Sequence, residues 1–273
     1  MPSSNPAFSR GFGGAGNGPQ YAGWGTAPQQ GYGAPAPTQH DPYAAPSPYA
    51  ATTTRYMTMD DVVTKTGISF LVTVVSAAAV WALPGSTGWG LALPAALVAF
   101  VLGLVIAFKT VANPAATLAY GALYGAALGA ISEAFNTVYP GIVMQALIGT
   151  FGVFAGMLVV YKTGAIRVTP KLTRWVIGAA IGALVLMFAN LIGAWIGGGD
   201  GLGLRSGGPI AIVFSLVVIG IAAFMLLLDF DMADEAIRRG APAKFAWYIA
   251  FGLLVTVVWL YMEILRLLSY FRE

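Results

Sequence analysis

Seven long apolar runs dominate the sequence, and they restrict what this chain can fold into more than any other feature. A helix needs about 20 mostly apolar residues to cross a bilayer, so each run predicts one membrane-spanning helix. The last run would form a helix about 40 Å long, which must tilt or extend past the interface. The sequence therefore predicts an all-α integral membrane protein. The seven runs cover residues 66–84, 88–108, 115–137, 140–161, 175–197, 209–229 and 245–271.

The composition is typical of an integral membrane protein. Hydrophobic residues make up 58% of the chain and charged residues only 9%, whereas soluble domains carry roughly a quarter charged residues. The chain has no cysteine, which excludes disulfides and thiolate sites. Its one histidine, His40, lies in the N-terminal segment, so we expect no histidine-ligated metal and no histidine-dependent catalytic triad. The net charge of +3 is small, and we expect the lipid bilayer rather than nucleic acid as the partner.

The first 56 residues form a segment of their own. They are rich in Gly, Pro, Ala, Gln and Tyr and have no helical period. Such a sequence cannot bury enough apolar surface to offset the entropy of ordering, so we predict a disordered, low-complexity tail. The capping-box pattern Thr58-Met-Asp-Asp61 then predicts the start of the first helix. The chain thus divides into a tail, residues 1–56, and a seven-helix transmembrane domain, residues 57–273.

The lysines and arginines predict the orientation, because cytoplasmic loops carry an excess of them. If the tail is cytoplasmic, eleven fall on the cytoplasmic side and only two on the other. We therefore predict a multi-pass protein of the plasma membrane with its N-terminus inside and its C-terminus outside. The two groups are Arg10, Arg55, Lys65, Lys109, Lys162, Arg167, Lys171, Arg174, Arg238, Arg239 and Lys244 against Arg205 and Arg272.

Rows of glycine predict how the helices pack. Small residues at three- or four-residue spacing let helix backbones approach closely where lipid supplies no hydrophobic drive. Three of the predicted helices carry such rows, which indicates a compact bundle. The rows are Gly121, Gly125 and Gly129; Gly149, Gly152 and Gly156; and Gly178 and Gly182.

Few ionisable residues lie within the apolar runs. An ionised group at bilayer depth costs about 2.5–3.5 kcal/mol on insertion scales, so each one needs a partner or a function. Asp229 directly follows an apolar run, and Asp231 is its neighbour. Asp234 and Glu235 fit a solvated helix end balanced by the arginines that follow. Glu133 continues the first glycine row by four residues, so we expect it to point into the bundle.

Glu263 lies near the middle of the last run, and its sequence context allows two partners. Arg266 is three residues further on the same helical face, so the two can form an internal ion pair. Alternatively, Glu263 faces Asp229 or Asp231 across the bundle. Two acids in one poorly hydrated site cannot both ionise cheaply, so they would share a proton near neutral pH and form a pH-sensitive latch or a cation site.

Three polar residues in other runs are candidates for lining a pore. They are Glu133, Gln145 and Asn190. Glu133 can line an entry path or bond Asn136 or Asn190, and the sequence does not choose between these.

Three segments, taken in order, resemble the Bax inhibitor family, also called the transmembrane Bax-inhibitor-motif or YccA-like family. "YPGIVMQALIGTFGVF" is similar to the fourth helix of that family, "LLLDFD" to the end of the sixth, and "LYMEILRLLSYF" to the last. The resemblance spans roughly residues 57 to 273 and leaves the tail outside. It implies six helices around a central last helix, and a pH-sensitive calcium leak that a carboxylate pair between the sixth and last helices closes.

The resemblance also implies which residues form that latch. The acid of the last helix falls on Glu263; the acid of the sixth falls on Asp229 when aligned on the preceding Leu and on Asp231 when aligned on the aromatic. Asp229 and Glu263 are then the possible calcium ligands, with calcium as a transported or bound ion and no other cofactor. The sequence departs from the family pattern in having Glu rather than Asp at 263, and Arg266 where the family usually has Asn. A cation at that point would repel calcium.

Other functions fit the sequence in different degrees. A non-transporting regulator that binds another membrane protein, such as a quality-control protease, is the main alternative. An intramembrane aspartyl protease is disfavoured, because "GGGD" at 197–200 precedes "FD" at 230–231, the reverse of the order in that enzyme class. A secondary transporter stays an alternative, although we find no convincing inverted repeat. Because the protease pattern is reversed and the membrane domain has neither cysteine nor histidine, we expect no enzymatic activity.

Overall fold

The computed structural model describes residues 55–83, 87–197 and 201–272. All described residues belong to one compact unit, Ala51–Glu273. Apart from Arg55 and Tyr56, the predicted tail lies outside the described residues, as do Arg10, His40 and Asp200.

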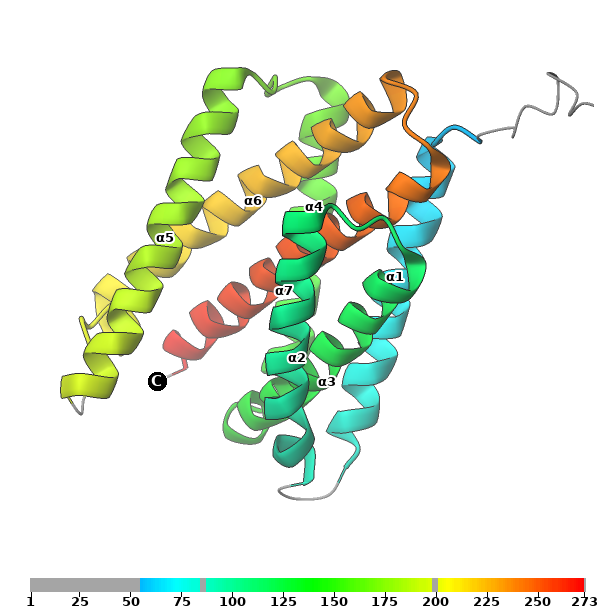
Figure 1. Cartoon of the computed structure of the whole chain (residues 1–273). Helices are drawn as coiled ribbons and strands as arrows, with labels where there is room; N and C mark the ends of the chain where they lie inside the picture. Colours follow the sequence, from blue (N-terminus) through cyan, green and yellow to red (C-terminus); the bar gives the residue numbers. More distant parts are fainter. Residues whose placement is uncertain (1–54, 84–86, 198–200, 273) are drawn as a thin grey trace, which may run out of the picture. The chain divides into compact units, whose positions relative to one another are not determined.

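Seven α-helices, all long and apolar enough to cross a membrane, form the described part of the chain (Figure 1). This confirms the predicted all-α, seven-span membrane fold. A short 3-10 turn, Ala243–Phe245, precedes the last helix. The helices are α1 Met59–Trp81, α2 Thr87–Lys109, α3 Pro114–Val138, α4 Ile142–Thr163, α5 Pro170–Gly197, α6 Gly208–Arg238 and α7 Ala246–Tyr270.

Helices α1 and α6 extend furthest beyond the predicted apolar runs. Helix α1 begins at Met59 because Thr58 caps it: the Thr58 hydroxyl accepts from the Asp61 N–H, and the Asp61 carboxylate accepts from the Thr58 N–H. This confirms the predicted capping box. The sequence predicted that the sixth run ends at Asp229. Helix α6 instead continues to Arg238, so Asp229 lies inside the helix. After Asp229, residues with high helix propensity and pairs of opposite charge at four-residue spacing stabilise the helical conformation.

Helix α7 is the centre of the bundle. In an apolar 18-residue stretch of α7, 72% of the residues are buried inside the protein, whereas 17–50% are buried in the corresponding stretches of the other six helices. Helices α1, α3, α4 and α6 pack on it directly, whereas α2 packs mainly on α3 and α5 on α6. In Figure 1, α5 accordingly lies beside α6 at the left, away from α1. The expectation of six helices around the last one is therefore met by four of them.

Helices α1 and α3 approach each other most closely, and glycine makes this possible. A Cβ atom added to Gly125 would lie 2.4 Å from the carbonyl oxygen of Thr73, and one added to Gly129 would lie 2.2 Å from that of Ala77. Ser76 also donates a 2.6 Å hydrogen bond to the carbonyl oxygen of Ala122. The first glycine row therefore has the packing role that the sequence predicted.

The other two glycine rows do not have that role. A Cβ added to Gly149 would lie 3.2 Å from the Ile264 side chain of α7, so this position faces a flexible side chain and not a helix backbone. At the remaining positions of these rows, an added Cβ would have no neighbour within 4 Å among the described residues. No described helix packs closely there, and the prediction was wrong for these positions. Those positions are Gly152, Gly156, Gly178 and Gly182.

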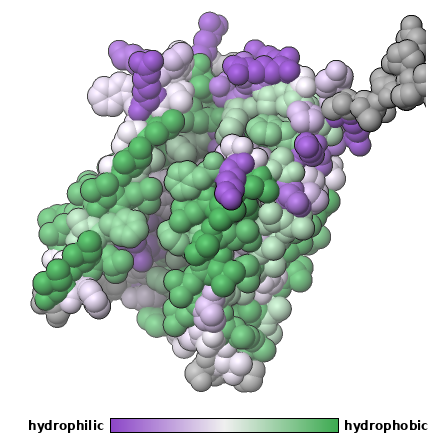
Figure 2. All heavy atoms as spheres, viewed as in Figure 1, coloured by the Kyte–Doolittle hydropathy of each residue, from purple (hydrophilic) through white to green (hydrophobic). Residues whose placement is uncertain are grey.

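One end of the bundle, which we call the basic end, carries most of the lysines and arginines. It comprises the starts of α1, α3, α5 and α7 and the ends of α2, α4 and α6. Hydrophilic residues gather at the upper part of the face shown in Figure 2, above helices covered by hydrophobic residues. The cations of the basic end within the described residues are Arg55, Lys65, Lys109, Lys162, Arg167, Lys171, Arg174, Arg238, Arg239 and Lys244.

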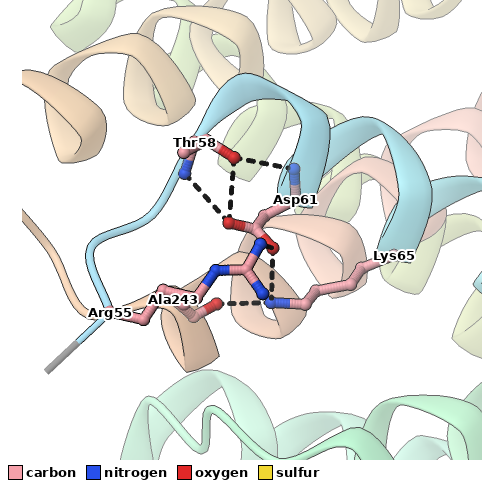
Figure 3. Close-up of polar contacts among 5 residues, drawn as sticks. All are labelled: Arg55, Thr58, Asp61, Lys65 and Ala243. Carbon is pink, nitrogen blue, oxygen red and sulfur yellow. Dashed lines mark hydrogen bonds and ion pairs between the residues drawn. The ribbon is translucent and has the colours of Figure 1, made fainter. Parts of the chain in front are cut away.

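A polar cluster at the basic end ties the start of α1 to the connection between α6 and α7 (Figure 3). Buried Asp61 accepts from Arg55 at 3.1 Å and faces Lys65 at 3.7 Å. The Lys65 ammonium also donates to the carbonyl oxygen of Ala243 at 2.5 Å. Tyr56 pairs with Pro242 in an isolated bridge. Arg55 and Tyr56, which the sequence assigned to the tail, thus belong to the ordered structure.

Candidate functional site

Two buried acidic side chains lie at the central helix, one on α7 itself and one on the neighbouring α6. The structure gives each a different partner. Asp229 on α6 is 6% exposed and Glu263 on α7 is 3% exposed. Both lie within helices that span the membrane, so each is a candidate functional residue on physical grounds.

Asp229 contacts the basic-end half of α7. The Thr256 hydroxyl donates to Asp229 Oδ2 at 2.6 Å. One helical turn earlier, Gly252 lies next to the carboxylate: a Cβ added there would be in ordinary van der Waals contact with Asp229 Oδ1, at 3.7 Å. Among the described residues, Asp229 makes no ion pair. A buried acid with a neutral partner and no counter-charge is stable there as the neutral form or with a bound cation.

Glu263 contacts the opposite half of the bundle. Its Oε1 accepts from Arg205 Nη2 at 2.5 Å, which forms a buried ion pair. Arg205 comes from the α5–α6 connection, and its carbonyl oxygen accepts from the Tyr270 hydroxyl at 3.4 Å. The sequence analysis offered Arg266 or a sixth-helix aspartate as the partner of Glu263. The structure corrects both, because the connection folds back and places a loop arginine against α7.

Asn190 and a glycine bring Arg205 into position. Asn190 Oδ1 accepts from the N–H groups of Leu202 and Leu204, at 3.0 and 3.3 Å. Gly201 has φ +65°, and a Cβ there would lie 2.3 Å from the Asn190 carbonyl oxygen. Only glycine tolerates this left-handed turn at such a close approach. The chain therefore turns back toward the bundle just before Arg205.

The ion pair is incompletely satisfied. Arg205 Nε and Glu263 Oε2 are buried and have no hydrogen-bond partner among the described residues. Burial lowers the pKa of the Arg205 guanidinium from its ordinary value, and the charge of Glu263 opposes this shift. Because guanidinium groups titrate far above neutrality, Arg205 stays cationic at physiological pH. It therefore supplies a fixed positive charge beside Glu263.

The two buried carboxylates do not form a direct pair. Asp229 binds Thr256, which is seven residues from Glu263 on α7, or about 10 Å along the helix. In the described part of the chain, no three Asp, Glu, His or Cys side chains lie close enough to hold a metal ion. The structure therefore does not assemble the predicted latch between Asp229 and Glu263, nor a calcium site that includes both.

The remaining acids of α6 lie nearer the basic end. Asp231 is half-buried, and no hydrogen bond or ion pair involves it within the described ranges. Asp234 pairs with Arg238 and also accepts from Tyr161, while Glu235 pairs with Arg239 at 2.7 Å. The last two pairs are the solvated helix end that the sequence predicted. Of the two candidate acids on α6, only Asp229 is buried against α7.

The three predicted pore-lining residues contact three different neighbours. Glu133 is half-buried and accepts from the Thr137 hydroxyl on its own helix. Gln145 is exposed and accepts from Arg272 at 2.8 Å. Asn190 is buried and holds the α5–α6 connection. The structure does not bring these side chains together.

Two residues of the site were missed from the sequence. Thr256 is a lone hydroxyl in an apolar run, and nothing in its spacing pointed to Asp229. Arg205 carried a signal: it is one of only two cations predicted on its side of the membrane, and it stands in a glycine-rich segment able to fold back. A third buried contact, 2.7 Å between the hydroxyls of Ser132 and Tyr261, joins α3 to α7.

A family model described as Bax inhibitor 1 like matches residues 5–273. The match covers nearly the whole chain and reaches into the N-terminal segment, which the resemblance by motifs had left outside. No curated protein sequence matches the chain.

Proposed function

Because the chain belongs to the Bax inhibitor 1 like family, we propose that it is a pH-sensitive cation leak rather than an enzyme. Calcium is the cation that we propose it carries. It lies in the plasma membrane, with the basic end and the N-terminus in the cytoplasm and the C-terminus outside, in keeping with the excess of lysine and arginine at that end.

One observation supports this proposal most directly: Asp229 of α6 is buried against the central helix, and among the described residues its partner is a hydroxyl and not a cation. A carboxylate in this setting responds to pH, since its neutral form fits the closed bundle and its ionised form requires water or a cation. Ionisation would therefore favour separation of α6 from α7. The Asp229 carboxylate is a hard oxygen ligand of the kind that calcium prefers, and the Thr256 hydroxyl adds a second oxygen beside it.

The ion pair of Glu263 and Arg205 supports a second barrier at the opposite end of α7. A fixed guanidinium beside the path repels cations as long as it stays in place. Withdrawal of the α5–α6 connection would remove this charge and leave Glu263 free to attract them. The proposed path thus has two controls at different depths, one titratable and one electrostatic.

The test is calcium flux into liposomes that contain the purified protein and enclose a calcium-sensitive dye, at acidic and at neutral pH. The parent should pass calcium in a pH-dependent way, and Asp229→Asn should abolish that dependence. Glu235→Gln is the matched control, because Glu235 lies on the same helix in an exposed pair with Arg239. Parent and Asp229→Asn fluxes that follow the same pH profile would rule out Asp229 as the pH-sensitive group.

Absence of flux at every pH would favour the alternative function, a regulator that binds another membrane protein. Helix α5, which packs mainly on α6 and exposes Trp175 and Trp195, is the element that such a partner would reach most easily. Co-purification with and without residues 1–56 then tests whether the N-terminal segment recruits the partner.

A further inference from the structure

A cleft of about 450 Å³ lies between α1 and α4, with α6 and α7 as its floor. Phe70, Phe154, Phe230, Leu253 and Val257 are among its lining residues. The volume falls in the range of sites that hold small ligands, about 300–1,000 Å³. The proposed leak makes no use of this cleft.

The cleft faces the lipid phase. Helices α1 and α4 both pack on α7 but hardly contact each other, so the space between them opens sideways. In a bundle that spans the membrane, such an opening is exposed to acyl chains and not to bulk water. Its apolar lining offers an acyl chain an environment as favourable as the surrounding lipid.

The cleft also contains a polar group in need of a partner. Thr66 lines it, is 7% exposed, and has a buried hydroxyl with no hydrogen-bond partner among the described residues. An unpaired buried hydroxyl costs about 1–3 kcal/mol, so most native structures satisfy it. An acceptor such as an ester carbonyl, carried into the cleft by a ligand, would do so.

A free cation stands at the rim of the cleft. Lys162 is in the last turn of α4 at the basic end and lines the cleft. Nearby cations are committed to acids: Lys65 to Asp61, Arg238 to Asp234 and Arg239 to Glu235. Within the part of the chain that the structure describes, no ion pair includes Lys162. Its ammonium is available to a phosphate at the membrane surface.

We propose that this cleft binds one anionic phospholipid from the leaflet at the basic end. One acyl chain lies between α1 and α4, the ester region lies near Thr66, and the phosphate contacts Lys162. The order of these groups, charge at the helix end and hydroxyl deeper along α1, matches the order of phosphate, ester and chain in a phospholipid. This site does not depend on cation transport.

Native mass spectrometry of the purified full chain, titrated with palmitoyl-oleoyl phosphatidylglycerol or phosphatidylcholine, tests the site. We expect one phosphatidylglycerol bound in preference to phosphatidylcholine. Gly67→Phe fills the cleft from a position where an added Cβ meets nothing within 4 Å, and it should weaken phosphatidylglycerol binding about ten-fold or more. Gly178→Phe is the matched control, since Gly178 is equally open but lies on α5 outside the cleft.

The headgroup contact has its own pair of variants. Lys162→Gln should reduce the preference for phosphatidylglycerol to about one, whereas Lys171→Gln, an exposed lysine of the same end, should keep it. If Gly67→Phe does not yield a monodisperse protein, Val63→Trp fills the same cleft from its exposed rim. Unchanged binding in the filling variant, or equal affinity of the parent for both lipids, would refute the proposal.

Discussion

The guanidinium of Arg205, from the α5–α6 connection, lies 2.5 Å from the carboxylate of Glu263 in the interior of α7. A contact between a loop and the central helix closes the end of the bundle opposite the basic end. Both side chains are largely removed from solvent, so each depends on the other for its charge balance.

Breaking this pair should therefore destabilise the protein. Glu263→Met leaves the Arg205 charge buried without a partner and should lower the free energy of unfolding by about 3–5 kcal/mol. The double variant Arg205→Met with Glu263→Met removes both charges and should recover most of that loss. Denaturant unfolding in micelles measures the free energy of unfolding of each variant. If the double variant loses as much of this free energy as the two single variants together, the two residues are not coupled.

Removal of the Thr256 hydroxyl should move the pH dependence of calcium flux. A hydrogen bond donated to a carboxylate stabilises its ionised form, so in Thr256→Val protonation persists to higher pH. With about 1.5–3 kcal/mol for such a bond and 1.36 kcal/mol per pH unit, the midpoint of the flux profile should rise by about one to two units. Thr150→Val is the control, because Thr150 is equally buried but bonds only its own helix.

The close approach of α1 and α3 predicts opposite effects for two glycine substitutions. Gly125→Ala places a methyl group against the Thr73 backbone and should lower the free energy of unfolding by about 1–3 kcal/mol. Gly178→Ala meets open space and should leave it unchanged or raise it by up to about 1 kcal/mol. Unfolding in micelles compares the two, and equal effects would mean that the helices separate readily.

The cap of α1 makes a separate prediction. Thr58→Ala removes the acceptor for the Asp61 N–H and should cost about 0.5–2 kcal/mol in the free energy of unfolding. Thr58→Ser keeps a hydroxyl and should retain most of the stability. If the Thr58→Ser variant is as unstable as the Thr58→Ala variant, the lost stability comes from the threonine methyl group and not from the cap.

The absence of native cysteine allows a direct test of orientation. Ser206 and Lys171 are exposed at opposite ends of the bundle. A membrane-impermeant maleimide should label Ser206→Cys in intact cells and Lys171→Cys only after permeabilisation. The reverse pattern would place the basic end outside.

The number, order and approximate bounds of the helices could be predicted because bilayer thickness fixes how long an apolar run must be. The start of α1 could be read from Thr58 and Asp61, since a capping box is a local pattern. The end of α6 could not be read from hydropathy, because the charged residues after Asp229 lower the hydropathy of its last turns. Ion pairs such as Glu235 and Arg239 and buried residues such as Ala233 together hold these turns in place. Charge at a helix end is compatible with either a loop or a helix.

The candidate site was predicted only in part. The sequence pointed to Asp229 and Glu263 through their depth in apolar runs, and both are buried. It did not yield their partners, because a hydrogen bond between α6 and α7, or from a loop to α7, depends on helix rotation and on the path of the chain. Glycines such as Gly201 determine that path through a backbone conformation that a sequence pattern does not specify.

The glycine contacts between α1 and α3 have a mechanical consequence. With Gly125 and Gly129 seated against the backbone at Thr73 and Ala77, the two helices can neither slide nor rotate past each other without collision. We therefore expect the pair of helices α1 and α3 to keep its arrangement while other helices move. Spin labels on these two helices should keep a fixed separation in any conducting state, while the distance between labels on α6 and α7 grows.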